Sequence, residues 1–221
     1  MAGIFKGTFV NAALAAGLLS IAAATANAAV VNPGLEVGAS AEVGPTGGTV
    51  VATSSQPVAA LTFTGTLTSS VISGDTSNPF NGSGGLTFVY QFTNTDTDAT
   101  PTSVTRLTVS EFTTFITDMS FVFNASLTAP TLADRSASGD VIGFSFLNPP
   151  AGQGKVDPGD TTTLLVVQTT ATSFAPSIAS IINGTTAQVP SFAPAAVPEP
   201  ATAGLLGAGA VALLRRRRRV R

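Results

Sequence analysis

The stretch LTFVYQFTN, from Leu86 to Asn94, decides the fold, because large apolar residues alternate in it with smaller or polar ones. Successive side chains of a β-strand point to opposite faces of the sheet, so residues two apart share a face. One face then holds Leu86, Phe88, Tyr90 and Phe92, and the other holds Thr87, Val89, Gln91 and Thr93. The stretch therefore predicts a strand with one face in a hydrophobic core.

Five further runs of strand-forming residues surround this stretch, and turn-forming residues separate them. They are ALTFTGTLTSSV (60–71), VTRLTVSEF (104–112), SFVFNASL (120–127), VIGFSF (141–146) and TTLLVVQTTA (162–171). In SFVFNASL the alternation places Phe121, Phe123, Ala125 and Leu127 on one face. The connecting segments are rich in Gly, Pro, Asn and Asp, as in ISGDTSNPFNGSGG (72–85).

These runs predict an all-β fold, an antiparallel β-sandwich of the jelly-roll or immunoglobulin-like type. A right-handed β-helix is the alternative fold, but the chain shows no fixed short repeat. We expect no long amphipathic helix in the body, and at most a short helix at SIASIIN (177–183).

Charge is strongly segregated along the chain. Of the ten basic residues, six lie in the last seven positions and Lys6 lies near the start. The remaining three, Arg106, Arg135 and Lys155, stand against twelve acidic residues, which all fall between Glu36 and Glu199. Binding to nucleic acid needs clustered Lys and Arg, so we expect no nucleic-acid partner for the body.

The residues usually needed for catalysis are scarce. The sequence has no His, Cys or Trp, which removes the commonest general base, the commonest metal ligands and a disulfide framework. Its acidic residues lie mostly in turns, where Asp is expected for backbone reasons. We therefore expect a protein without enzymatic activity and without a cofactor.

The first 28 residues have the pattern of a secretory signal peptide. Lys6 provides a weakly positive start, an apolar run follows, and Ala26-Asn27-Ala28 matches the small-residue pattern of a cleavage site. We expect a signal helix in this segment and cleavage after Ala28, with Ala26 as the second choice.

The C-terminal end combines three features in a fixed order. Pro198-Glu199-Pro200 precedes an uncharged run, 201–214, and a basic cluster of five arginines, 215–219, follows it. As a helix the uncharged run is only about 21 Å long, against a hydrocarbon core of about 30 Å. The basic cluster would keep its end cytoplasmic and the body outside. A plain tail anchor, a nucleic-acid-binding cluster and a lipid-anchor signal are the competing interpretations.

This three-part tail resembles the PEP-CTERM sorting signal of exported Gram-negative bacterial proteins. The basic stop of that pattern corresponds to Arg215, Arg216, Arg217, Arg218 and Arg219. The resemblance covers about 25 residues and implies recognition by an exosortase, a membrane protease that cuts near the motif. It also implies secretion, transient anchoring in the inner membrane, and a destination at the cell surface or in an extracellular matrix with exopolysaccharide or biofilm.

Two segments of the body are candidate binding sites. Asn94, Asp96 and Asp98 stand at alternate positions, which resembles the spacing of oxygen ligands in a calcium loop. Ala99 and Thr105 replace the Gly and Glu that an EF-hand requires, so only a simpler calcium site or an ordinary polar turn remains. The threonines at every second position of 62–68 suit either an exposed strand face or an ordered surface such as an ice-binding face.

The sequence thus divides into a signal peptide (1–28), a β-sandwich domain (29–190), a Pro/Ala-rich linker with the sorting motif (191–200), a transmembrane helix (201–214) and a cytoplasmic basic tail (215–221). We expect an exported surface or matrix protein without enzymatic activity. The alternative is a carbohydrate-active module or a calcium-dependent carbohydrate-binding module.

Overall fold

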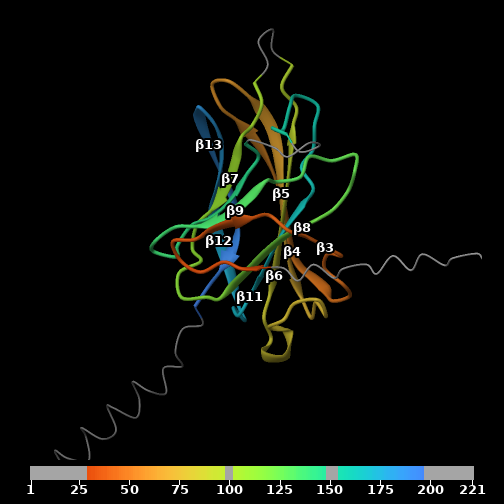
Figure 1. Cartoon of the computed structure of the whole chain (residues 1–221), viewed down its shortest axis with the longest axis vertical. Helices are drawn as coiled ribbons and strands as arrows, with labels where there is room; N and C mark the ends of the chain where they lie inside the picture. The colour runs from red at the N-terminus through yellow and green to blue at the C-terminus, as the bar shows by residue number, and fades with distance from the viewer. Residues whose placement is uncertain (1–28, 98–101, 148–153, 197–221) are drawn as a thin grey trace, which may run out of the picture.

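The computed structural model describes residues 29–97, 102–147 and 154–196 (Figure 1). The expected signal helix (1–28), transmembrane helix (201–214), basic tail (215–221) and sorting motif all lie outside these residues. Within the described part of the chain, no helix is long and apolar enough to cross a membrane.

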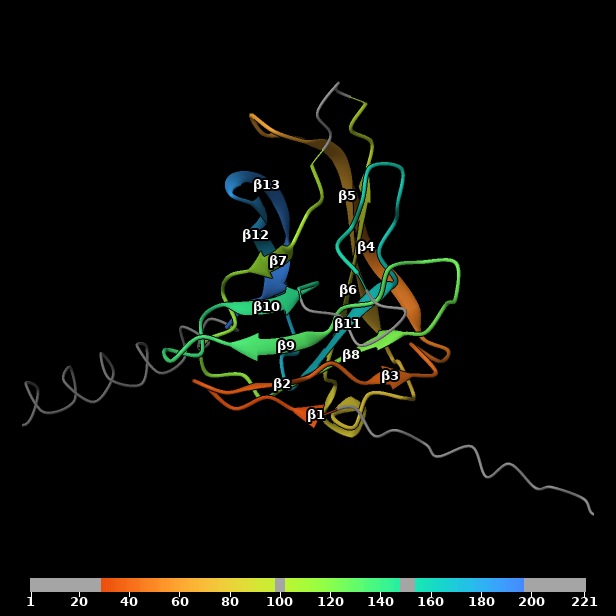
Figure 2. The same cartoon turned by 45° about the horizontal axis from the view of Figure 1, so that its top comes forward.

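The body is an all-β sandwich of two sheets, which confirms the fold expected from the sequence (Figure 2). The first sheet runs in the order β1-β8-β11-β6-β5-β4, with β3 also paired to β8. Its strands are β1 (Ala29–Val30), β3 (Ala41–Glu42), β4 (Thr49–Ala59), β5 (Thr64–Ser73), β6 (Thr87–Asn94), β8 (Thr117–Val122) and β11 (Leu164–Thr169).

The second sheet runs in the order β13-β12-β7-β10-β9-β2. Its strands are β2 (Glu36–Gly38), β7 (Arg106–Val109), β9 (Leu132–Arg135), β10 (Ile142–Ser145), β12 (Phe174–Asn183) and β13 (Thr185–Pro194). A 3-10 turn, η1 (Asn81–Ser83), lies in the loop between β5 and β6. The named strand pairs are antiparallel except β3 and β8, which run parallel.

Strand β6 lies inside the first sheet between β11 and β5, and its alternation decides where the core sits. Phe88, Tyr90 and Phe92 are buried between the two sheets, as the sequence predicted. Phe88 meets Phe112 edge-on, with ring centroids 6.0 Å apart, an arrangement that adds about 0.5–1.5 kcal/mol beyond area burial. The Phe-rich alternation therefore supplies the centre of the core.

The other face of β6 is covered as well, which the alternating pattern did not predict. Thr87 is fully buried and Val89 is only 9% exposed. The loop after β5 explains part of this, because Asp75 and Asn78 both hydrogen-bond to the Thr87 hydroxyl. The first sheet is thus buried on both faces near its middle, and its outer face contains polar groups removed from water.

Strand β8 ends earlier than the sequence suggested. It stops at Val122, and Phe123 is 66% exposed, so the expectation that Phe123 faces the core with Phe121 is wrong. The physical reason is a turn at Asn124, whose side-chain oxygen accepts the Ser126 N–H and whose carbonyl accepts the Leu127 N–H. Asn favours such a turn over continuation of a strand.

Strand β13 ends later than the sequence suggested. It continues to Pro194, so residues 191–194 belong to the sheet and the linker begins four residues further on than the expected boundary. The segment SIASIIN, expected to be at most a short helix, lies in β12. Ser177, Ala179 and Ile181 are buried at every second position, because pairing with β13 on one side and β7 on the other imposes the strand period.

Candidate ligand-binding groove

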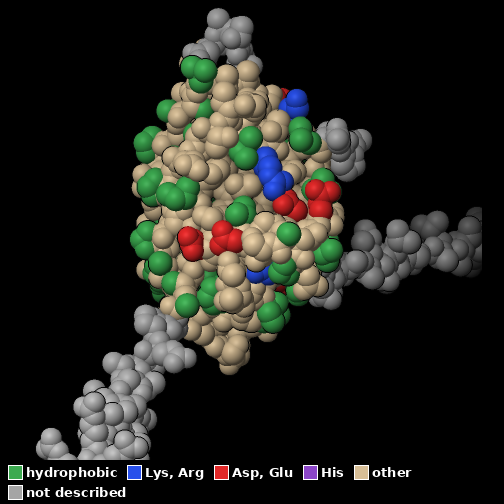
Figure 3. Space-filling view, turned by 90° about the vertical axis from the view of Figure 1, so that its left-hand side faces the viewer, with side chains coloured by type: hydrophobic (Ala, Val, Ile, Leu, Met, Phe, Trp, Pro, Cys, Tyr) green, Lys and Arg blue, Asp and Glu red, His purple; other side chains and the backbone are tan. Residues whose placement is uncertain are grey.

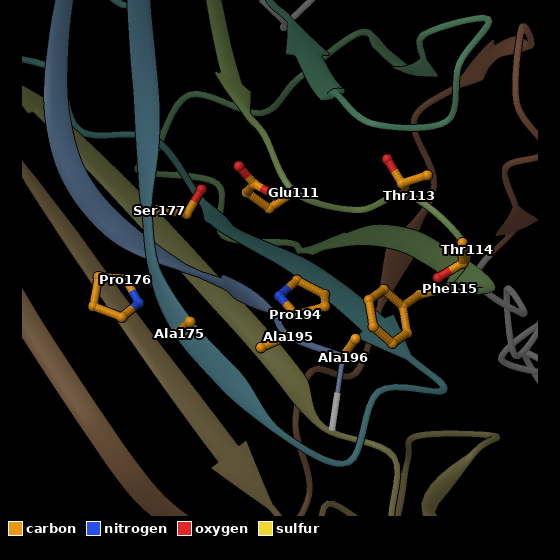
Figure 4. A pocket seen from close by; sticks show the side chains of 10 residues that line it. All are labelled: Glu111, Thr113, Thr114, Phe115, Ala175, Pro176, Ser177, Pro194, Ala195 and Ala196. Atoms are coloured by element: carbon orange, nitrogen blue, oxygen red, sulfur yellow. The ribbon is translucent and has the colours of Figure 1, made fainter. Parts of the chain in front are cut away.

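A groove of about 390 Å³ lies where the last two strands meet the segment after β7 (Figure 4). Its residues come from the 111–115 segment, from the start of β12 at 175–177, and from the end of β13 and its continuation at 194–196. In the view of Figure 4, Glu111, Thr113 and Ser177 lie along the upper edge. Phe115 and Pro194 lie below them, so the groove combines a polar edge with an apolar one.

Two residues of the groove have a positive φ, a backbone conformation that residues other than glycine rarely adopt. Glu111 has φ 77° and Thr114 has φ 72°, and for a β-branched residue such as Thr this conformation is a genuine outlier. Each such residue costs on the order of 1–3 kcal/mol and persists only where its surroundings hold it. Strain of this kind clusters at ligand sites, so the groove is the best candidate site of the body.

Neighbouring groups hold the strained segment in place. Phe112, between the two strained residues, is fully buried, and its N–H donates to the Asp140 carbonyl at 2.9 Å. The Arg135 guanidinium donates to the Phe112 carbonyl at 2.6 Å and to the Gly139 carbonyl at 2.9 Å. The Thr113 hydroxyl donates to the Asp140 carboxylate at 2.9 Å. The segment is therefore fixed by the core and by β9.

Arg135 is buried, and two backbone carbonyls and the Thr117 hydroxyl, rather than a carboxylate, accept its hydrogen bonds. Burial lowers the pKa of its guanidinium below the ordinary value. Within the described residues the salt bridge found is the one between Arg106 and Asp134, at 2.7 Å. Arg135 thus serves to position the groove segment, because it donates to the Phe112 carbonyl within that segment.

The opposite wall of the groove is fixed by strand pairing. Ser177 on β12 donates its hydroxyl hydrogen to the Ser110 carbonyl at 3.1 Å. Beyond β13, the Ala195 N–H donates to the Ser173 carbonyl at 3.0 Å, and the Ser173 hydroxyl donates back to the Ala195 carbonyl at 2.7 Å. The two chain segments therefore stay together as far as Ala195.

The lining of the groove mixes polar and apolar groups. It offers one carboxylate, at Glu111, and hydroxyl groups at Thr113, Thr114 and Ser177, beside the apolar side chains of Phe115 and Pro194. The lining therefore offers hydrogen-bonding groups beside an apolar surface, as ligand sites commonly do. Much of the face in Figure 3 is tan, the colour of the backbone and of side chains that are neither charged nor hydrophobic.

The suggested calcium loop behaves as a polar turn as far as the structure describes it. Asn94 is fully buried, and its amide donates to the carbonyls of Thr102 and Val156 at 3.1 and 3.0 Å. Its side-chain oxygen accepts the Asp96 N–H at 3.1 Å. Asp98 lies outside the described residues, within which no three acidic side chains are grouped as metal ligands.

The threonines of 62–68 do not form one uniform row. Thr64, Thr66 and Thr68 lie on β5, but Thr62 precedes the strand and its hydroxyl meets that of Thr185 at 2.7 Å. Across the sheet Thr68 pairs with Ser55 and Gln91, and these neighbours break a repeating threonine surface.

Sequence reasoning did not find the groove. Its two residues with positive φ are Glu and Thr, whereas Gly or Asn is the residue expected at such positions. Its walls also come from segments that lie far apart in the chain. A weak signal existed at Glu111, where a charged residue interrupts an otherwise strand-like run.

Comparison with known proteins adds one finding. Residues 196–219 match the model of the PEP-CTERM protein-sorting motif. Curated proteins and solved structures gave no match to the chain. The match starts two residues after β13 ends and spans the Pro-Glu-Pro sequence, the uncharged run and the arginines. The chain therefore carries a C-terminal PEP-CTERM protein-sorting motif, the signal of an exported protein that an exosortase sorts.

Proposed function

We propose that the mature body is a cell-surface or extracellular-matrix protein without enzymatic activity, associated with exopolysaccharide or biofilm. The observation that carries this proposal is the position of the sorting motif. The matched segment begins at residue 196, just after β13 ends at Pro194. A cut within the motif would release or transfer the sandwich with all its strands, so the folded body is the sorted cargo.

Composition supports a structural role for this cargo. The sequence has no His or Cys, and the body is acidic, which favours solubility outside the cell. One continuous hydrophobic core joins both sheets. The body can therefore remain folded without disulfides after export.

A direct test is to see where the exported protein goes in a host with the cognate exosortase. Cells are grown with their matrix, the exopolysaccharide is stripped by shear, and the protein is quantified in the cell, matrix and medium fractions. We expect the protein to co-purify with the polysaccharide fraction and to leave it after enzymatic digestion of that polysaccharide. Recovery of the protein as free monomer in the medium would contradict the proposal.

Carbohydrate binding at the groove is the second candidate function, and the strained pair Glu111 and Thr114 favours it. Phe115 offers an apolar ring face to a sugar, and Glu111 offers an acceptor for its hydroxyl groups. A screen of the exported protein against purified polysaccharides, with and without calcium, tests it. Phe115→Ala should abolish binding, whereas Phe123→Ala, an exposed Phe outside the groove, should leave binding unchanged.

A further inference from the structure

A second group of polar side chains lies on the outer face of the first sheet, away from the groove residues. Asp118 and Ser120 stand two apart on β8 and share a face, opposite to that of the core residues Met119 and Phe121. Glu42 on β3 pairs in parallel register with Val122, which shares this outer face. The three residues Glu42, Asp118 and Ser120 form what we call the β3–β8 cluster.

Asp118 and Ser120 are buried and Glu42 is half-buried, and the Ser120 hydroxyl lies near the Glu42 carboxylate without a hydrogen bond of normal geometry to it. Asp118 is 5% exposed and Ser120 is 0% exposed. Asp118 Oδ1, Ser120 Oγ and Glu42 Oε1 are all buried and have no hydrogen-bond partner. A buried acceptor left unsatisfied costs roughly 1–3 kcal/mol, and more when the group is charged. Two carboxyl groups and a hydroxyl in this state are compensated either by a bound partner or by protonation of the carboxyl groups.

Asp75, on the same face, shows how a carboxylate is satisfied in this protein. It accepts hydrogen bonds from the Thr87 hydroxyl at 2.7 Å, from the Ser77 hydroxyl at 2.6 Å and from the Thr46 N–H at 2.9 Å. Burial alone would raise the pKa of Asp75, but these bonds outweigh burial and lower it. Asp75 thus has donors for its buried oxygens, whereas Glu42 Oε1 and Asp118 Oδ1 are buried without one.

The two ionisable groups of the cluster are both carboxyl groups, so its charges have the same sign. Burial raises the pKa of Asp118 to about 6. Burial also raises the pKa of Glu42; the nearby Ser120 hydroxyl opposes this, and the negative charges of Asp118 and Asp75 add to it. Arg106 is paired with Asp134 and Arg135 donates to carbonyls near the groove, so neither arginine neutralises the cluster.

We propose that a divalent cation, with Ca²⁺ as the best match to these oxygen ligands, binds between Glu42, Asp118 and Ser120. Hard cations such as Ca²⁺ take carboxylate, hydroxyl, carbonyl and water oxygens, six to eight in all. The cluster supplies two carboxylates and one hydroxyl, and backbone carbonyls and water complete the shell. The cation balances the negative charges of the Glu42 and Asp118 carboxylates and is coordinated by the three unpartnered oxygens.

Such a cation would attach the N-terminal part of the body to the sheet. Strand β3 pairs with β8 over only two residues, Ala41 and Glu42, so its intrinsic attachment is weak. A ligand from β3 and two from β8 would join the same ion. The cation then stabilises the fold without being required for it, because the Phe-rich core is independent of the cluster.

Thermal unfolding of the exported, processed protein tests this proposal. At about pH 7.5, a few millimolar CaCl2 should raise the melting temperature by about 5–10 °C over NaCl of equal ionic strength, and chelator should reverse the rise. The circular dichroism spectrum should stay that of a β-protein in chelator. Isothermal titration calorimetry with CaCl2 should show one site per chain.

Matched variants locate the site. Asp118→Asn and Glu42→Gln should each abolish the response to CaCl2 while remaining folded, since each removes one buried charge. Glu36→Gln, an exposed acid on β2, should respond like the original protein. No response of the original protein to CaCl2 or MgCl2 would overturn the proposal, as would a full response in Asp118→Asn. The first result would mean that the two carboxyl groups are compensated by protonation alone.

Discussion

Tyr90 crosses the sandwich from β6 and donates its hydroxyl hydrogen to the Phe192 carbonyl on β13, at 2.7 Å. Tyr90 is fully buried, and burial raises the pKa of its hydroxyl well above the ordinary value, so the group stays a neutral donor. Strand β13 is the edge of its sheet, and carbonyls facing away from β12 have no strand partner. This hydrogen bond thus holds β13 to the core strand β6 two residues before β13 ends.

Tyr90→Phe should destabilise the body and loosen this end. The ring stays in the core, but the Phe192 carbonyl loses its donor, which costs about 1–2 kcal/mol of unfolding free energy. Urea unfolding of the exported protein measures the loss, and limited proteolysis should show faster cutting near residues 192–196. Unchanged stability and unchanged proteolysis would show that water replaces the hydroxyl at no cost.

The mature chain should begin at Ala29, with Asn27 as the second choice. The fold gives a reason beyond the Ala-Asn-Ala pattern, because Ala29 opens β1 and pairs with Met119. Val31 is fully buried, so cleavage further downstream would remove part of the core. N-terminal sequencing of the exported protein checks this. A start beyond Val31, or an intact Met1 on exported protein, would refute it.

Thr114→Gly should stabilise the body by about 1 kcal/mol. Thr114 has φ 72°, and glycine adopts that conformation without the clash of a Cβ atom, although it also loosens the unfolded chain. Thr114→Ala is the matched control, because it removes the hydroxyl but keeps Cβ and therefore keeps the strain. Denaturant unfolding of both variants gives the comparison. Equal stabilities for Gly and Ala at this position would mean that Thr114 carries no strain.

The stability difference between Asp118→Asn and the original protein should depend on pH. The pKa of Asp118 lies at about 6 in the fold, above its ordinary 3.8, because burial disfavours the charged form. The folded state then binds the proton more tightly, so the stability contributed by this group is present below about pH 4 and is lost as pH rises through 6. The neutral Asn loses nothing over that window.

Melting temperatures measured in chelator at about pH 4.5 and pH 7.5 check this. The melting temperature of Asp118→Asn should rise relative to that of the original protein as pH rises. Glu42 acts in the same direction as Asp118, while the lowered pKa of Asp75 acts in the opposite direction in both proteins. A difference in melting temperature between the two proteins that stays constant with pH would indicate that Asp118 is in contact with water.

The sequence predicted the strands that alternation of apolar and polar residues indicates. It did not predict burial that depends on other segments packing over a face of the sheet. The pattern at 86–94 gave a core strand, because Phe88, Tyr90 and Phe92 need burial wherever the strand lies. It could not show that Thr87 is buried too, since a distant loop supplies the cover. The exposed Phe123 shows the converse, because a local turn at Asn124 ended the strand that hydrophobicity alone would have extended.

The candidate sites lay further beyond sequence reasoning. The groove depends on β12 and β13 meeting a segment more than 60 residues upstream. Asp118 offered one signal, an acidic residue inside the strand-like run ITDMSFV (116–122), where Asp is disfavoured. Its partner Glu42 is brought to it by the parallel pairing of β3 with β8, and no pattern in the sequence indicated that pairing.

The central claim is that the C-terminal motif, rather than hydrophobicity alone, directs sorting, and one measurement tests it most directly. Pro198, Glu199 and Pro200 are changed together to Ala in a host with the cognate exosortase, which leaves residues 201–214 and the arginines untouched. The mass of the protein and its distribution between membrane and exported fractions are then compared with the original. We expect the variant to insert normally and to accumulate at full length, without its signal peptide, in the membrane fraction. Processing and release of the variant like the original would contradict the account and leave the tail as a plain anchor.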